Sequence, residues 1–181
     1  MRIEFRKRKM NKIDLFLDRD GTLIEDPGYI NSPERVVFLD GVLDALQEFR
    51  KRNYRLHLVS NQSSVGRKII SEVQFLQIEA RFQKILLQHS ITFDSVNYCF
   101  HTPFDNCNCR KPKTGMFLEV DARFQIERNF CGMIGNSKSD HEAANNYGIT
   151  YWNIEETVRD SFSEQSRLVL THFERILSAA E

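Results

Sequence analysis

Two aspartates stand two residues apart at a place in the sequence where both could serve one reaction. Asp18 and Asp20 follow the apolar run 13–17, and Gly21 comes directly after them. Glycine eases a sharp turn because it has no Cβ, so both carboxylates can face one pocket. Bringing two anions together is costly unless a cation lies between them or one carboxyl group is protonated. Asp-x-Asp-Gly is also common in surface turns, but its place after an apolar run favours a functional site.

Metal-ligating side chains form a second group. Cys99 and His101 are followed, after five intervening residues, by Cys107 and Cys109. Three thiolates and one imidazole make a complete tetrahedral set for structural zinc, with no position left for water. The alternative is that the three cysteines are incidental, which the two close ligand pairs argue against. Cys131 stands apart in an apolar segment and is interpreted as a small buried hydrophobic residue.

The rest of the chain alternates between short apolar runs and longer amphipathic segments. The predicted strands are 13–17, 54–60, 96–100, 130–134 and 149–153. The predicted helices are 41–52, about 70–89, about 115–126, 139–147 and about 155–180. Strands that are apolar on successive residues are covered on both faces. The alternation therefore predicts an α/β fold, with a doubly wound, mainly parallel sheet and helices on both faces.

Such a sheet binds ligands beyond the carboxyl ends of its strands, and polar residues follow several of the predicted strands here. Besides the two aspartates, these residues are Ser60, Asn61, Arg110, Lys111, Asn136 and Asp140. In isolation Ser60 would be interpreted as a helix cap or a turn residue, and the segment 110–113 as a solvated basic turn. Their common position at strand ends favours a binding role instead.

The segment 16–23, FLDRDGTL, resembles the first motif of the haloacid dehalogenase superfamily of aspartate-nucleophile phosphatases. The resemblance implies that Asp18 attacks phosphorus and forms an aspartyl-phosphate. It implies that Asp20 protonates the leaving oxygen and then activates the hydrolytic water. It also implies a magnesium ion, held in part by Asp18 and Asp20, which screens the repulsion between carboxylate and phosphate.

The same resemblance assigns roles to the polar residues at the second and third strand ends. Ser60 would donate a hydrogen bond to the transferring phosphoryl group, with the Asn61 amide beside it. Lys111 would neutralise the phosphoryl charge and that of the nucleophilic aspartate. Arg110 would grip other groups of the substrate, because a guanidinium binds phosphate with two hydrogen bonds.

The fourth strand end departs from the family pattern. The family has an aspartate that completes the magnesium shell where this chain has Asn136, while Asp140 is retained. An amide oxygen can ligate magnesium but carries no charge, so we expect weaker binding. Asp140 would either compensate as a ligand or support the site from outside the shell. Asn136 is open to three interpretations: natural tuning, an inactivating substitution, or a mark of lost catalysis.

The spacing of the motifs leaves no room for a cap domain. The gaps 22–54 and 62–96 each hold a loop and about one helix, so we expect a single phosphatase domain over 1–181 with an open pocket. A zinc loop on a capless domain resembles the subgroup of heptose-bisphosphate and histidinol-phosphate phosphatases, and the resemblance covers about 13–154. The segments 28–30, 38–41 and 115–116 favour the heptose enzymes. The zinc-loop spacing fits either.

The resemblance therefore predicts a magnesium-dependent phosphomonoesterase that acts on a small sugar phosphate. The expected reaction removes the C7 phosphate of a heptose bisphosphate and would supply nucleotide-heptose for lipopolysaccharide or another surface glycan. One alternative is a histidinol-phosphate phosphatase. Another, motivated by Asn136, is a degenerate member that binds a phosphorylated ligand or a protein without turnover.

Composition supports a globular chain with no general attraction to polyanions. The 181 residues are 41% hydrophobic and include 14 Phe, which excludes disorder and collagen-like repeats. The 25 basic and 25 acidic residues cancel, so we expect no nucleic-acid partner. We expect no membrane insertion, because no apolar run approaches the roughly 20 residues of a membrane span.

The two ends of the chain carry less specific signals. The segment 1–12 is a basic N-terminal extension without the apolar core of a secretory signal, so we expect a cytoplasmic, reducing compartment. It is interpreted as a solvated terminus, with a nucleic-acid or membrane contact as the alternative. The segment 155–181 predicts a C-terminal helix whose apolar positions cover either the sheet or a partner subunit. We expect the former, and a monomer.

Overall fold

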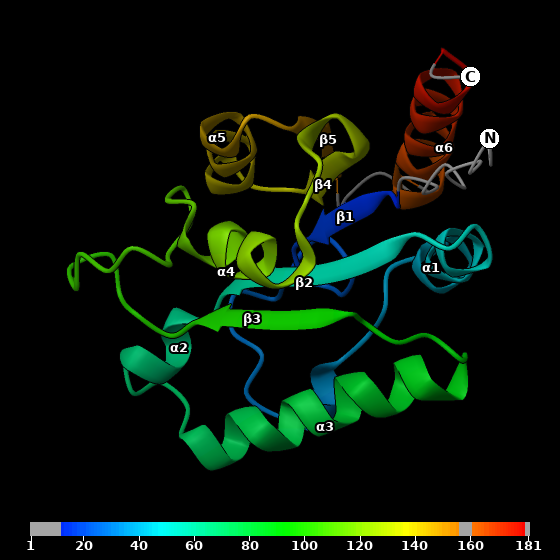
Figure 1. Ribbon diagram of the computed structural model, residues 1–181. Coiled ribbons are helices and arrows are strands. Elements are labelled where there is room, and N and C mark those ends of the chain that lie inside the picture. The colour runs from blue at the N-terminus through cyan, green and yellow to red at the C-terminus, as the bar shows by residue number, and fades with distance from the viewer. Residues whose placement is uncertain (1–11, 156–160, 180–181) are drawn as a thin grey trace, which may run out of the picture.

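The computed structural model describes residues 12–155 and 161–179, and within them the strands form one parallel sheet. The strands are β1 (Asp14–Leu17), β2 (Arg55–Asn61), β3 (Ser95–Cys99), β4 (Cys131–Gly135) and β5 (Thr150–Asn153). Their order across the sheet is β3-β2-β1-β4-β5, so β1 lies at the centre (Figure 1). The basic segment 1–11 and the residues 156–160 and 180–181 of the predicted C-terminal helix lie outside the described residues.

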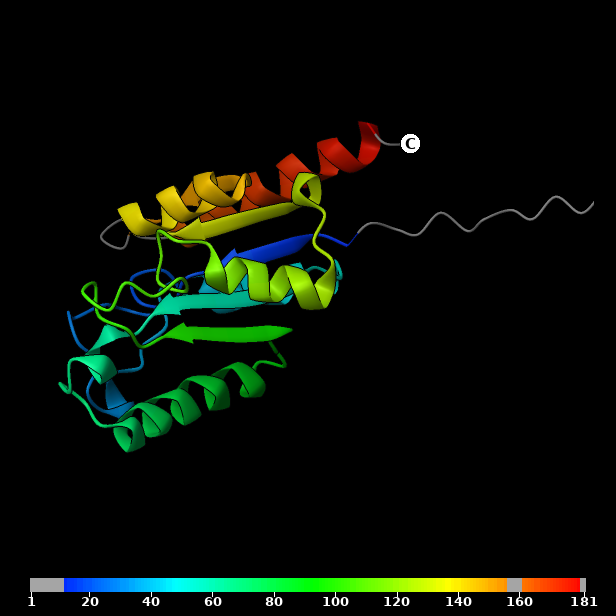
Figure 2. The same cartoon turned by 60° about the vertical axis from the view of Figure 1, so that its left-hand side comes forward.

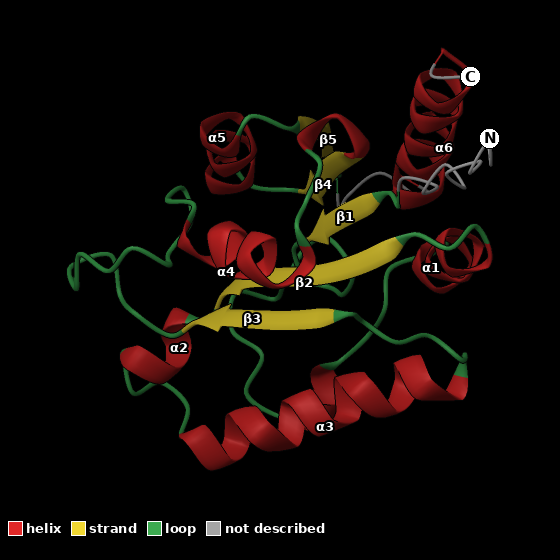
Figure 3. Ribbon diagram, viewed as in Figure 1, coloured by secondary structure: helices red, strands yellow, loops and turns green. Residues whose placement is uncertain are grey.

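Helices connect the strands and cover both faces of the sheet (Figure 3). The α-helices are α1 (Val42–Lys51), α2 (Ser63–Gly66), α3 (Glu72–Gln88), α4 (Gly115–Phe124), α5 (Lys138–Tyr147) and α6 (Ser161–Ala179). Two short 3₁₀ helices are η1 (Pro33–Arg35) and η2 (Arg128–Phe130). The predicted parallel α/β fold is therefore confirmed. The sequence pattern missed α2, η1 and η2, because three or four residues are too few to show a helical period.

The alternation of side chains along β1 explains why the sheet needs cover on both faces. Leu15 and Leu17 are buried in one apolar cluster with residues of α1, α3 and α6, such as Phe82. Phe16, which lies between them, is buried in a second cluster with α4 and α5, where its ring lies 4.6 Å from that of Phe117. Successive strand residues point to opposite faces, so the apolar run Leu15–Leu17 must be buried on both sides of the sheet.

The C-terminal helix lies against the molecule's own core. Within the described part of α6, Phe162, Val169 and Phe173 are buried. The ring of Phe173 lies 5.9 Å from that of Trp152 in β5, and 6.1 Å from that of Tyr54. These contacts show that α6 covers the sheet, as expected. None of the described helices is both long and apolar enough to span a membrane.

The parallel register brings the polar strand ends together. Leu17, the last residue of β1, pairs with Leu58 of β2 on one side and with Ile134 of β4 on the other. All the strand arrows end on the same side of the molecule, where loops emerge (Figure 2). The residues that follow β1, β2 and β4 must therefore lie side by side at that edge.

Helix α5 begins at the same edge of the sheet, and a capping box forms its first turn. Ser137 Oγ accepts a hydrogen bond from Asp140 N, and Asp140 Oδ2 accepts one from Ser137 N. These reciprocal bonds satisfy amide groups that the first helical turn leaves without partners. Gly135 is required beside them, because a Cβ at that position would lie 2.7 Å from the Asp140 carboxylate. The capping box thus fixes the position of Asp140 next to the end of β4.

Candidate active site

A cavity of about 240 Å³ opens at the carboxyl edge of the sheet. Its lining includes all eight residues to which the sequence analysis assigned phosphate or magnesium chemistry: Asp18, Asp20, Ser60, Asn61, Arg110, Lys111, Asn136 and Asp140. The segment 28–30, the segment 62–64, Asp26, Ser137 and Ser139 complete it. Side chains from four strand ends therefore meet in one space, as the predicted topology requires.

Lys111 lies at the centre of the charged groups. Its Nζ donates to Asp18 Oδ1 at 2.6 Å and to the carbonyl of Val59 at 2.7 Å, and it lies 2.6 Å from Asp140 Oδ1. The residue is only 2% exposed. Burying an ammonium group is costly unless it is paired, and here two carboxylates pair with it. Lys111 thereby links the end of β1 to the start of α5.

The backbone of Lys111 is held by a second contact, from β2. Lys111 N donates to Asn61 Oδ1 at 3.0 Å, and Asn61 Nδ2 donates to the carbonyl of Lys111 at 3.1 Å. One amide side chain thus satisfies both polar backbone groups of the same residue. Asn61 lines the cavity, and these bonds show that it also positions Lys111.

Burial dominates the electrostatics of the aspartate at the end of β1. Desolvation raises the pKa of Asp18 to about 7, Lys111 acts to lower it, and Asp140 acts to raise it. Burial would also lower the pKa of Lys111, but the carboxylates of Asp18 and Asp140 outweigh it and raise that pKa above its ordinary value. The lysine therefore remains charged, and a second cation near Asp18 would favour its ionised form.

The second aspartate is held by two residues that the sequence analysis did not single out. Asp20 Oδ1 accepts a hydrogen bond from Arg19 Nε at 2.7 Å, and Asp20 Oδ2 accepts one from Gln62 Nε2 at 2.7 Å. Arg19 stands between the two aspartates, after the end of β1, and its guanidinium makes two hydrogen bonds to the Asp20 carboxylate. A fully buried arginine has no signature in local sequence, so only the structure shows these contacts.

After β4, Asn136 contributes an amide, and Asp140 contributes a carboxylate whose two oxygen atoms both already have partners. Asn136 Oδ1 accepts a hydrogen bond from Thr22 Oγ1 at 3.3 Å, which ties it to the loop that follows Asp20. Asp140 uses one oxygen for Lys111 and the other for the capping box. This arrangement supports the second of the two roles considered for Asp140, that of a residue acting from outside the metal shell.

The basic residues near the cavity differ in what they contact. Arg110 lines the cavity, and its Nη1 donates to the carbonyl of His101 at 3.1 Å. Lys138 does not line it; its side chain is 88% exposed and pairs with Glu142 on the surface of α5. The two residues beside Lys138 in the sequence, Ser137 and Ser139, do line the cavity, and each has a hydroxyl group. Among the described residues that line the cavity, Arg110 and Lys111 therefore supply the positive charge.

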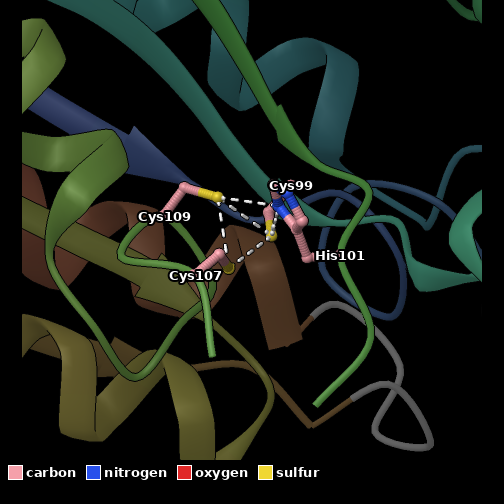
Figure 4. A group of neighbouring side chains, drawn as sticks. All are labelled: Cys99, His101, Cys107 and Cys109. Atoms are coloured by element: carbon pink, nitrogen blue, oxygen red, sulfur yellow. Dashed lines mark hydrogen bonds between the residues drawn. The ribbon is translucent and has the colours of Figure 1, made fainter. Parts of the chain in front are cut away.

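The cysteine and histidine residues form a compact group beside the cavity (Figure 4). The ligand atoms of Cys99, His101, Cys107 and Cys109 all lie within 4.8 Å of one another. The distance between sulfur atoms is 3.7 Å from Cys99 to Cys107 and 3.4 Å from Cys109 to Cys107. A tetrahedral ion with sulfur ligands at about 2.3 Å needs separations of about 3.7 Å. The donor set and its spacing fit one metal ion, with all four positions filled by protein.

Comparisons with other proteins agree with the fold. Residues 12–158 match the family model described as polynucleotide kinase 3 phosphatase. The D-glycero-beta-D-manno-heptose-1,7-bisphosphate 7-phosphatase of Haemophilus influenzae is 40% identical over 140 residues, which cover 74% of this chain and 76% of the relative. The histidine biosynthesis bifunctional protein HisB of Legionella pneumophila is 35% identical over 150 residues, covering 82% of this chain and 42% of that protein.

A solved structure shows the same architecture. The crystal structure of D,D-heptose 1,7-bisphosphate phosphatase from B. bronchiseptica, complexed with magnesium and phosphate, matches with a TM-score of 0.79 at 25% identity. The match covers 88% of this chain and 99% of that chain. The fold and these similarities define an enzyme of the haloacid dehalogenase class of phosphatases. The chain belongs to the family that the polynucleotide kinase 3 phosphatase model describes, with the heptose-bisphosphate 7-phosphatases among its relatives.

The position of Lys111 predicts a large effect on stability. Lys111→Met leaves the buried Asp18 and Asp140 carboxylates without their shared cation, so we expect the free energy of unfolding to fall by about 3 kcal/mol. The matched control is Lys138→Met, which removes an exposed lysine and should cost less than about 0.5 kcal/mol. Chemical denaturation in magnesium-free buffer measures both. Equal stabilities for the two variants would show that the buried charge cluster contributes nothing.

Proposed function

We propose that this phosphatase removes the C7 phosphate of D-glycero-D-manno-heptose 1,7-bisphosphate in a magnesium-dependent reaction. The observation that carries the proposal is the convergence of Asp18, Asp20, Ser60 and Lys111 on one cavity. The 40% identity to a heptose-bisphosphate 7-phosphatase supports this choice of substrate. The product would enter nucleotide-heptose synthesis for lipopolysaccharide or another surface glycan, in the cytoplasm.

The charges of the cavity support the binding of a divalent cation. Among the described residues that line it, four are aspartates and two are basic. A phosphate dianion would be repelled by this excess of carboxylates unless a cation offset it. The residues proposed to hold magnesium are Asp18, Asp20 and Asn136, whose oxygen atoms are the ligands that magnesium prefers. Bound magnesium would supply positive charge that screens the approach of carboxylate to phosphate.

The first half of the proposed reaction forms an ester on the enzyme. A carboxylate oxygen of Asp18 attacks phosphorus, and the bond between phosphorus and the sugar oxygen breaks. Asp20 gives its proton to that leaving oxygen, so that the sugar departs as an alcohol. Ser60 binds a phosphoryl oxygen, and the buried charge of Lys111 beside Asp18 helps to neutralise the transferring group in the transition state.

The second half releases phosphate and restores the enzyme. Asp20, now ionised, takes a proton from a water molecule, and the water oxygen attacks the phosphorus of the aspartyl-phosphate. The bond between phosphorus and Asp18 breaks, which releases inorganic phosphate and the free carboxylate. The pair therefore needs one carboxyl group that stays a nucleophile and one that exchanges a proton.

We further propose that Cys99, His101, Cys107 and Cys109 bind a structural zinc ion. The segment 100–110 contains no helix or strand and has little apolar core of its own, so metal binding would supply its folding free energy. Cys109 lies directly before Arg110, and Arg110 donates to the carbonyl of His101. Closing this loop around an ion would therefore hold Arg110 and Lys111 at the cavity.

The histidinol-phosphate alternative is supported by the similarity to the bifunctional protein HisB. The degenerate alternative is supported by Asn136, which lowers the negative charge available to magnesium. A substrate panel separates these alternatives from the heptose proposal.

We expect magnesium-dependent phosphate release from heptose bisphosphate, measured with malachite green. Asp18→Asn should reduce kcat by at least about 1,000-fold, because the nucleophile is lost. Asp44→Asn, the same change on the exposed face of α1, is the matched control and should keep full activity. Faster turnover of histidinol phosphate would move the assignment to the rival enzyme. No hydrolysis of any phosphomonoester would support the degenerate alternative.

Restoring the family's aspartate tests the proposed magnesium shell. In Asn136→Asp a charged ligand replaces a neutral one, so we expect the magnesium concentration for half-maximal activity to fall about tenfold. Asn145→Asp, an exposed site on α5, makes the same change in net charge and should leave this concentration unchanged. An unaltered requirement in Asn136→Asp would place Asn136 outside the shell.

Elemental analysis tests the zinc proposal without using activity. We expect about one equivalent of zinc in the purified protein, and loss of that zinc in Cys107→Ser. Chelation should also increase proteolytic cleavage within 99–109. The matched control is Cys131→Ser, which lies in β4 outside the group and should retain the metal. Protein that folds normally without bound zinc would contradict the proposal.

A further inference from the structure

Gln62, the residue directly after β2, connects the two halves of the proposed catalytic machinery. Its Oε1 accepts a hydrogen bond from Arg19 Nη2 at 2.8 Å. Its Nε2 donates to Asp20 Oδ2 at 2.7 Å and to Ser60 Oγ at 3.0 Å. A single buried amide thus contacts the proposed acid and base as well as the proposed phosphoryl ligand.

The chemistry of the three partners permits only one orientation of this amide. Arginine can only donate hydrogen bonds, and an ionised carboxylate can only accept them. The amide oxygen of Gln62 must therefore face Arg19, which turns its two N–H groups toward Asp20 and Ser60. Because Ser60 Oγ accepts one of them, its own hydroxyl proton is left to donate to a phosphoryl oxygen.

Arg19 provides a rigid anchor for this arrangement. It is 1% exposed, and its guanidinium lies over the rings of Tyr98 and Phe75, at 5.5 and 5.8 Å from their centroids. Its Nη1 lies 3.8 Å from Glu79 Oε2 on α3. Arg19 is not among the residues that line the cavity, so it acts on the site only through the groups it holds. A guanidinium fixed on three sides can fix the amide bonded to it.

We propose that Gln62, anchored by Arg19, is a positioning residue that sets the orientation of the Asp20 carboxylate and the Ser60 hydroxyl for phosphoryl transfer. The inference rests on the proposed phosphatase reaction. It adds to that reaction a residue that holds Asp20, the proposed acid and base, in a fixed position relative to Ser60, the proposed ligand of the phosphoryl group. Gln62 takes no part in bond making. Its loss should therefore slow the chemical steps more than it weakens phosphate binding, which Lys111 and the magnesium ligands would retain.

The test compares Gln62→Leu, which removes the amide, with Gln62→Glu, which keeps its size and its acceptor for Arg19 but cannot donate to Asp20. We expect kcat for p-nitrophenyl phosphate and heptose bisphosphate to fall at least about tenfold in both variants. In Gln62→Leu, which adds no charge to the cavity, KM and the inhibition constant of inorganic phosphate should stay within about threefold of the parent values. Should Gln62→Leu fail to fold, Gln62→Glu carries the test, because it can still pair with Arg19.

The matched control is Gln47→Leu, which removes an amide that donates to the carbonyl of His89; neither residue lines the cavity. It should leave kcat unchanged. A kcat for Gln62→Glu within about twofold of the parent, or a loss explained entirely by a higher KM, would overturn the proposal.

A crystal structure of Gln62→Leu decides the positioning claim independently of turnover. We expect the Asp20 carboxylate to turn away from the orientation it has in the parent, and an unmoved carboxylate would overturn the claim. A parent protein that hydrolyses no phosphomonoester would instead defeat the proposed function, and the structure of the variant would still report on Gln62.

Discussion

Lys111 carries one positive charge into a place where two carboxylates are buried, and the arrangement of the site depends on that charge. Asp18 reaches it from the end of β1, and Asp140 reaches it from the first turn of α5. Without the lysine, β1 and α5 could not bring both carboxylates to one edge of the sheet at an acceptable cost in desolvation. Asn61 adds the backbone clamp that keeps the lysine in place. Stability and proposed catalysis therefore depend on the same ion pairs.

The loop 100–110, which leads to Lys111, has little apolar core of its own. The metal-ligating side chains of Cys99, His101, Cys107 and Cys109 lie together in and beside this loop, where they could replace such a core. Cys99 ends β3, Cys109 precedes the basic pair, and Arg110 bonds back to the carbonyl of His101. In a phosphatase without a cap domain, the loops themselves must shape the substrate pocket. The proposed metal ion would give this loop a defined conformation.

The two aspartates of the motif have different surroundings, and that difference suits their different proposed tasks. Asp18 is paired with Lys111, whose charge favours the ionised carboxylate that a nucleophile needs. Asp20 is held by Arg19 and Gln62 at the edge of the cavity, where it can meet a leaving oxygen or a water molecule. Asn136 makes the cavity less negative than an aspartate would, so the remaining carboxylates carry more of the proposed magnesium binding.

The sequence by itself determined the parallel α/β fold, the strand ends that line the cavity and the grouping of Cys99, His101, Cys107 and Cys109. These features follow from local patterns: apolar runs, the spacing of ligands and the shared edge of parallel strands. Only the tertiary structure decided that Asp140 pairs with Lys111, that Lys138 points to solvent, and that Arg19 and Gln62 hold Asp20. The pair between Asp140 and Lys111 and the bond between Gln62 and Asp20 join residues from different elements, and they depend on strand register and burial, which no local pattern contains.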